Sequence, residues 1–192
     1  MDELLSTYIQ SFSKLSDLCE FPEIYPFVAA LATSESAPYG MVRWKPRRSE
    51  TRASLLEPIY AKLPARFPPL FERLLLTYRW AEVDLQVYRL LPNPLGDDLD
   101  GFFQQMTGDK GLWESLIPAG FIQFGKGPDV DYDPVCFDLS SRKKNREMRI
   151  VKIDHEEILC NSRIRVVTEL APSFEALAQD TIALANRKSP GE

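Results

Sequence analysis

Histidine and cysteine are scarce in this sequence: its 192 residues contain one histidine, His155, and three cysteines, Cys19, Cys136 and Cys160. The cysteines are odd in number and none stands at CxxC spacing, which indicates reduced thiols rather than a disulfide framework. No stretch approaches the roughly 18 apolar residues that span a membrane, and the acidic start MDELLSTYIQ is unlike the basic start of a signal peptide. We therefore expect a cytoplasmic protein that does not enter a membrane.

Basic residues are also in deficit, with 23 Lys and Arg against 28 Asp and Glu, which gives a net charge of −5. Proteins that bind DNA or RNA directly need a surplus of basic residues to displace counterions. The balance argues against nucleic acid as a direct partner. It suits a basic protein partner, and it equally suits a protein that the charge merely keeps in solution.

Motifs of the common enzyme classes are missing. There is no GxSxG and no P-loop, and Gly125 and Gly127 lack the third glycine of a dinucleotide-binding turn because Val130 stands in its place. Asp129, Asp131 and Asp133 open like a calcium loop, but the required glycine is Pro134 and the closing glutamate is Ser140. We expect no cofactor, no metal and no catalytic residues, with the three aspartates forming an acidic turn that bonds nearby backbone N–H groups.

The single histidine leaves three interpretations open. His155 stands between Asp154 and the pair Glu156–Glu157, so it has the neighbours of a general base. The sequence offers no nucleophile motif to go with it, and adjacent residues on a strand point to opposite faces. A structural residue that closes a strand, or a contact with a partner, are the other two interpretations.

Helical periodicity dominates the first half of the chain. The spacing predicts a helix over 3–19 that Pro22 and Pro26 end, a short helix over 26–32, and helical structure over 52–61. Residues 33–52 are rich in Pro, Ser, Arg and Lys, and we expect a long surface loop there with Trp44 against the body of the protein. A stronger helix lies within 63–80, with Pro68 and Pro69 in its first turn and an apolar face for a sheet.

Strands and short helices follow. Residues 82–91 alternate as a strand with Val83, Leu85 and Val87 on one side, and two short helices follow, with Asp98 and Asp109 as N-caps. Three strands at 121–124, 135–139 and 148–154, separated by a rigid loop and a charged tip, predict an antiparallel meander. In the middle strand we expect Val135, Phe137 and Leu139 to point inward. A last strand near 164–168 and a helix that Ser173 opens complete an α+β fold.

Five of these elements, taken in order, resemble the SUKH superfamily, also called the Smi/Knr-like domains. They are the segments LPARFPPLFERLLLTYRW, GFIQFG with the acidic loop after it, PVCFDL, RIVKIDHEE and APSFEALAQ. The resemblance covers about 52–185 and implies a curved, mostly antiparallel sheet with helices packed on one face. It divides the chain into an N-terminal helical extension with a basic linker loop, 1–51, and a SUKH-like domain, 52–188.

The resemblance also implies a function. Bacterial members of this family are largely immunity proteins that bind and neutralise toxin domains, often nucleases, and a fungal relative acts through protein contacts. We therefore expect a non-enzymatic protein-binding domain, with a scaffold or regulatory module that has no toxin partner as the alternative. The predicted contact residues lie on the acidic loop and at the histidine: Asp129, Asp131, Tyr132, Asp133 and His155.

A second acidic region is formed by Asp97, Asp98, Asp100, Asp109 and Glu114. It is either a solvated helix surface or a patch that imitates nucleic acid in front of a nuclease. The oligomeric state and the partner's identity do not follow from the residues.

Overall fold

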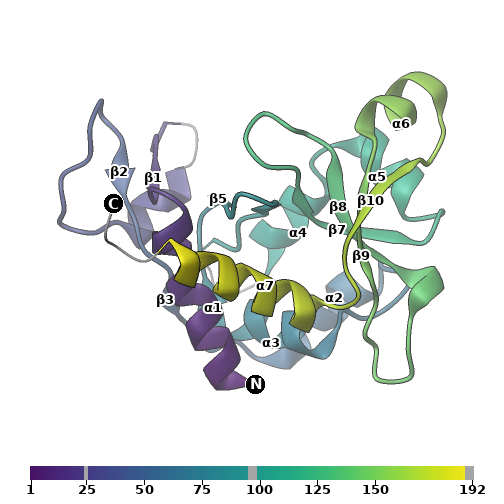
Figure 1. Cartoon of the computed structure of the whole chain (residues 1–192), viewed down its shortest axis with the longest axis horizontal. Helices are drawn as coiled ribbons and strands as arrows, with labels where there is room; N and C mark the ends of the chain where they lie inside the picture. Colours follow the sequence, from purple (N-terminus) through teal and green to yellow (C-terminus); the bar gives the residue numbers. More distant parts are fainter. Residues whose placement is uncertain (24–25, 95–98, 189–192) are drawn as a thin grey trace.

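A six-stranded antiparallel sheet is the centre of the computed structural model, which describes residues 1–23, 26–94 and 99–188 (Figure 1). The strands lie in the order β10-β9-β8-β7-β6-β5, so each one pairs with its neighbour along the chain. Their bounds are β5 Val83–Asp84, β6 Arg89–Leu90, β7 Phe121–Lys126, β8 Pro134–Asp138, β9 Ile150–Ile153 and β10 Val166–Ala171. The predicted α+β class and the antiparallel meander are confirmed.

One face of the sheet is covered by three helices, α1 (Asp2–Leu15), α3 (Pro69–Thr77) and α7 (Phe174–Arg187). Phe71 of α3 is central to this core, with ring centroids 5.3 Å from Phe124, 5.1 Å from Phe137 and 5.0 Å from Phe174. As predicted, Pro69 lies in the first turn of α3, and the side chain of Ser173 caps α7 by accepting the N–H of Ala176.

Two more helices, α5 (Lys110–Leu116) and α6 (His155–Asn161), cover part of the opposite face. They close a smaller apolar cluster made of Leu112, Leu116, Phe121, Cys136, Val151, Ile153 and Ile158. The expected alternation of β8 is confirmed, since Val135, Phe137 and Leu139 face the main core and Cys136 faces this second cluster. Cys136 and Asp138 are buried as well, because both sides of the strand are covered. Helix α4 (Asp100–Thr107) precedes α5, and Asp109 caps α5 as predicted.

Helix α1 ends at Leu15, earlier than the predicted 19, because Ser16 turns to an extended backbone and Cys19 enters a short strand. The helix lies beside α7 (Figure 1), and the hydroxyls of Tyr8 and Tyr88 are 2.6 Å apart in the core. Loop 33–52 contains two short strands, and Trp44 is only 2% exposed, as expected.

The predicted strand over 82–91 is instead a tight hairpin. Gln86 has φ of 70° and its N–H donates to the Asp84 side chain, so the chain reverses between β5 and β6. Val83 and Leu85 are buried, but Val87 lies past the reversal and is 45% exposed. The alternating pattern missed a turn that Asp84 stabilises.

The remaining elements are short. They are β1 Cys19–Glu20, η1 Pro26–Leu31, β2 Val42–Arg43, β3 Arg47–Arg48, η2 Ala53–Leu56, α2 Glu57–Tyr60, β4 Tyr78–Arg79 and η3 Leu139–Ser141. Strand β1 pairs with β2 and β3 with β4, which ties the N-terminal region to the end of α3. The predicted helices at 26–32 and 52–61 are confirmed as short helical segments.

Candidate functional site

The loop 127–133 joins β7 to β8 and is closed by its own backbone. The N–H of Gly127 donates to the carbonyl of Asp133 over 2.8 Å, and the N–H of Asp131 donates to that of Pro128 over 3.0 Å. A Cβ at Gly127 would lie 2.1 Å from Cγ of Asp131, so this position requires glycine. The loop therefore has a compact shape in which the Asp131 side chain folds back over Gly127.

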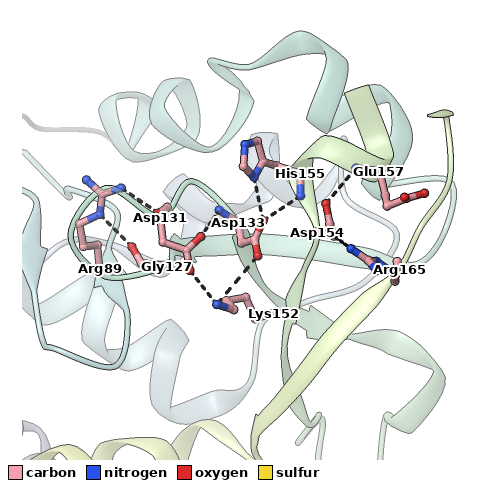
Figure 2. A network of polar contacts seen from close by, with 9 residues as sticks. All are labelled: Arg89, Gly127, Asp131, Asp133, Lys152, Asp154, His155, Glu157 and Arg165. Atoms are coloured by element: carbon pink, nitrogen blue, oxygen red, sulfur yellow. Dashed lines mark hydrogen bonds and ion pairs between the residues drawn. The ribbon is translucent and has the colours of Figure 1, made fainter. Parts of the chain in front are cut away.

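Two of the three predicted loop carboxylates hold the loop to the sheet (Figure 2). Asp131 accepts the N–H of Asp133 and lies 2.6 Å from Nζ of Lys152. Burial alone would raise the pKa of Asp131, but these two hydrogen bonds outweigh burial, and the pKa lies below its ordinary value. Asp133 bonds His155 and lies 3.9 Å from the same Lys152 ammonium. The predicted bonding of aspartates to backbone N–H groups is confirmed for Asp131 and Asp133.

Arg89 of β6 holds the loop through hydrogen bonds to its backbone carbonyls. Its Nε donates to the carbonyl of Gly127 over 2.9 Å and its Nη2 to that of Asp131 over 3.0 Å. Its guanidinium also lies 5.5 Å from the centre of the Tyr132 ring and pairs with Glu82. Arg89 and Lys152 were not among the predicted site residues, because neither stands near the loop in the sequence.

His155 begins helix α6 and does not close a strand. The Asp154 side chain accepts the N–H of Glu157 as the N-cap, which is the role that a residue before a helix commonly has. Asp133 Oδ1 lies 2.7 Å from Nδ1 of His155 and accepts the His155 N–H over 2.9 Å. The structure thus places the histidine against the loop and makes it part of the anchor between the loop and α6.

The three loop carboxylates differ in exposure, and the side chains of Asp131 and Asp133 are only 29% and 15% exposed. Asp129 is exposed, and next to it Val130 is 75% exposed and Tyr132 58% exposed. Leu159, on α6 near the loop, is 53% exposed. The surface of the loop is accordingly apolar and aromatic as much as acidic, since Asp131 and Asp133 are engaged by Lys152 and His155.

A hollow of about 360 Å³ lies beside this loop, on the face of the sheet that α5 and α6 leave partly open. Its walls include Gln123 and Lys126 of β7, Tyr132, His155, Leu112 and Leu159. None of the described residues that line it is a serine, threonine or cysteine. The described residues also contain no group of three or more His, Cys, Asp or Glu side chains placed to hold a metal ion.

A second group of acidic side chains lies on the other side of the loop. Asp129 lines a smaller hollow of about 220 Å³ together with Asp17, Glu20, Glu82 and Asp84. Burial, and next the nearby charge of Glu82, raise the pKa of Glu20. This group was not predicted, because its members come from three separate segments that the fold brings together.

The second predicted acidic region is only partly within the described residues, since Asp97 and Asp98 lie outside them. Asp109 caps α5, and Glu114 lies 3.6 Å from Lys110 on the exposed side of that helix. The three cysteines are unpaired, with Cys136 buried and Cys160 exposed. No helix among the described segments has the length and apolar character to cross a membrane.

No model of a known protein family matches the sequence, and no curated protein matches it either.

Proposed function

We propose that this protein is a non-enzymatic protein-binding domain whose partner docks on the surface of loop 127–133 and α6. The observation that carries the proposal is the exposure of Tyr132 and Leu159, which line a hollow, and of Val130 on the same loop as Tyr132. Apolar and aromatic side chains exposed together in this way are typical of protein interfaces.

The anchoring of the loop supports the same proposal. Arg89, Lys152 and His155 each bond the loop, so its shape is set before a partner arrives. A rigid loop loses little conformational entropy on binding, and its side chains are presented in one arrangement. Tyr132 is the side chain that we expect to contribute most.

Charge favours a basic partner. Asp129 of the loop is exposed and lines the smaller hollow with Glu20, Asp84 and Asp17, the last of which pairs with Arg43, and the whole chain carries −5. A basic surface that approaches this region meets an attractive field, which speeds association more than it strengthens the final complex. The expected mechanism is steric and electrostatic occlusion with no cofactor.

The resemblance of residues 52–185 to the SUKH superfamily supports a toxin domain, possibly a nuclease, as the partner. The alternative is a scaffold or regulatory module that acts through protein contacts without a toxin. Both use the same surface, and they differ in what the partner does when it is free.

The experiment is capture of partners by the full chain from native cells, identification by mass spectrometry, and reconstitution of the complex from purified components. We expect a reconstituted partner whose expression alone stops growth and whose co-expression with this protein restores it. A reconstituted partner that is harmless when expressed alone would favour the scaffold alternative. Failure of every captured protein to reconstitute would overturn the proposal of a binding domain.

A further inference from the structure

The hollow beside loop 127–133 presents hydrogen-bond acceptors that no described residue uses. Gln123 is only 7% exposed, and its Nε2 donates to the carbonyl of Gly125 over 3.1 Å. Its Oε1 is therefore the amide atom left for a ligand, and none of the described side chains or N–H groups donates to it. Gln123 lines the hollow, so a ligand there that supplies an N–H can donate to this oxygen.

His155 supplies a second acceptor. Its Nδ1 faces the carboxylate of Asp133, which only accepts, so a neutral ring carries its proton on Nδ1. Figure 2 shows the other ring nitrogen on the side away from Asp133. That Nε2 then has a free lone pair, and His155 lines the hollow.

The polar groups around the hollow are mostly acceptors. Lys126, the one lysine among its described lining residues, lies 3.6 Å from Glu82, a carboxylate that Arg89 also contacts, so Glu82 offsets its charge only in part. Asp109 lies at the rim, exposed, and uses one carboxylate oxygen to cap α5 at Leu112, which leaves its other oxygen for a ligand. Two neutral acceptors and one carboxylate together select a cation that carries several N–H donors.

The apolar walls select the shape of that cation. Leu112 and Leu159 line the hollow together with the exposed Tyr132. An arginine side chain matches this arrangement, because its methylene stem packs on leucines and its planar guanidinium carries five donors and lies flat on aromatic rings. Lysine carries the same charge on a compact, strongly hydrated ammonium group, and it has no planar group to lie on the tyrosine ring.

We propose that this hollow is the specificity pocket of the interface and receives one arginine side chain of the protein partner. The inference rests on the proposed function for the source of the arginine, while the chemistry of the hollow can be tested without any partner. The guanidinium N–H groups of this arginine donate to Asp109, Gln123 and His155. Its methylene stem and its guanidinium plane pack against Leu112, Leu159 and Tyr132.

The test is a ¹⁵N–¹H NMR titration of the full chain with blocked arginine (N-acetyl-arginine-N-methylamide). Blocked lysine and blocked citrulline, which has the shape of arginine without its charge, are titrated in parallel. We expect shifts at Gln123, His155 and Leu159 with blocked arginine. Blocked citrulline should bind about fivefold more weakly, as for loss of one partly exposed ionic contact. Blocked lysine should also bind more weakly, because it keeps the charge but lacks the planar set of donors. Equal shifts with all three probes, or none in the hollow, would overturn the inference.

Two matched variants sharpen the test. Asp109→Asn keeps an N-cap for α5 and removes the charge, and we expect about fivefold weaker binding of blocked arginine. Glu114→Gln makes the same change on the same helix outside the hollow and should bind as the wild type does. Undiminished binding by Asp109→Asn would also contradict the proposal.

The outcomes separate the two proposals. A hollow that binds blocked arginine while no partner can be reconstituted supports the pocket and overturns the function. A reconstituted partner together with a hollow that ignores blocked arginine leaves the function standing and rejects the pocket.

Discussion

Single residues of loop 127–133 divide into those that hold its shape and those that face outward. Asp131 and Asp133 bond Lys152 and His155, whereas Asp129 is exposed and uses only its backbone N–H, which donates to Asp84. Replacing all three aspartates would change the loop's structure together with its charge. Replacing Asp129 alone removes a charge without removing a side-chain bond of the loop, so this variant separates the two effects.

Asp131→Asn should destabilise the protein at neutral pH by about 1 kcal/mol, because it weakens the bond to Lys152. The pKa of Asp131 is lowered in the folded state, so its contribution is present above the unfolded carboxyl pKa of about 3.9 and is lost as pH falls through the folded value. Urea unfolding of wild type and variant should therefore differ at pH 7 and approach each other as the pH is lowered beneath about 3.9.

Asp129→Asn is the control for this prediction, since it removes a neighbouring exposed charge. We expect its urea midpoint to equal that of the wild type at both pH values. A difference between Asp131→Asn and wild type that persists unchanged at low pH would show that the loss is not ionic.

Local and long-range contacts differ in how well the sequence predicts them. The caps at Asp109 and Ser173 were predicted because a cap and the N–H that it accepts lie within three residues. The support of the loop by Arg89 and Lys152 was not predicted, because these residues are 38 and 21 positions from the loop atoms that they bond. The acidic residues of the loop are evident from the sequence. Which of their carboxylates form hydrogen bonds and ion pairs is evident only from the fold.

At the scale of elements, the meander was predicted, whereas a hairpin, a short helix and the end of α1 were not. Strands β7, β8 and β9 follow from runs of apolar residues between polar turns. The hairpin at 85–88 was missed because Val87 continues the alternation past the turn, and α6 was missed because HEEILC is short. Its N-cap, Asp154, was visible in the sequence and was interpreted as the end of a strand.

Three elements meet at a buried hydroxyl network. Tyr8 of α1 and Thr181 of α7 bond Tyr88, next to β6, over 2.6 and 3.4 Å. Burial raises the pKa of Tyr88 to about 12, so its contribution to stability is present below pH 10 and is lost as pH rises through 12. Tyr88→Phe should cost about 1 kcal/mol at pH 7, and its unfolding free energy should fall less than that of the wild type between pH 10 and 12.

Urea unfolding at pH 7, 10 and 11.5 measures both parts of that prediction. Tyr39→Phe is the comparison, because Tyr39 is 90% exposed and lies outside this network, and it should show the same fall as the wild type. A fall between pH 10 and 12 as steep in Tyr88→Phe as in wild type would contradict the assignment of the alkaline titration to this network.

Helix α7 depends on its cap. Ser173→Ala removes the bond to the Ala176 N–H and should lower the free energy of unfolding by about 1 kcal/mol. Ser173→Asp keeps a capping oxygen and should stay near the wild type. Thermal melts of the three proteins measure the difference, and equal melting temperatures for all three would show that the cap contributes nothing.

At the scale of the molecule, α1 shares the main core with the rest of the chain. Leu5, Tyr8 and Phe12 are buried in one cluster with Phe71 and Phe174. Residues 1–51 were predicted to be an extension, since the resemblance begins near residue 52. Removing 1–51 uncovers one side of α7 and of the Phe71 cluster.

Residues 52–192 alone should therefore fail to unfold cooperatively and should bind a hydrophobic dye such as ANS at neutral pH. Circular dichroism melts of the truncated and the full chain give the comparison. A truncated protein with a sharp transition and no dye binding would show that 52–188 is an independent domain.

The central claim is that the surface of loop 127–133 and α6 binds a protein partner through its exposed tyrosine. The most direct measurement is the affinity of a reconstituted partner for Tyr132→Ala, with Tyr39→Ala as the matched control. Tyr39 is 90% exposed and lies outside both the loop and the hollow. We predict at least tenfold weaker binding for Tyr132→Ala, the size typical of a central interface residue, and wild-type affinity for Tyr39→Ala. Equal affinity of Tyr132→Ala and wild type would contradict the account.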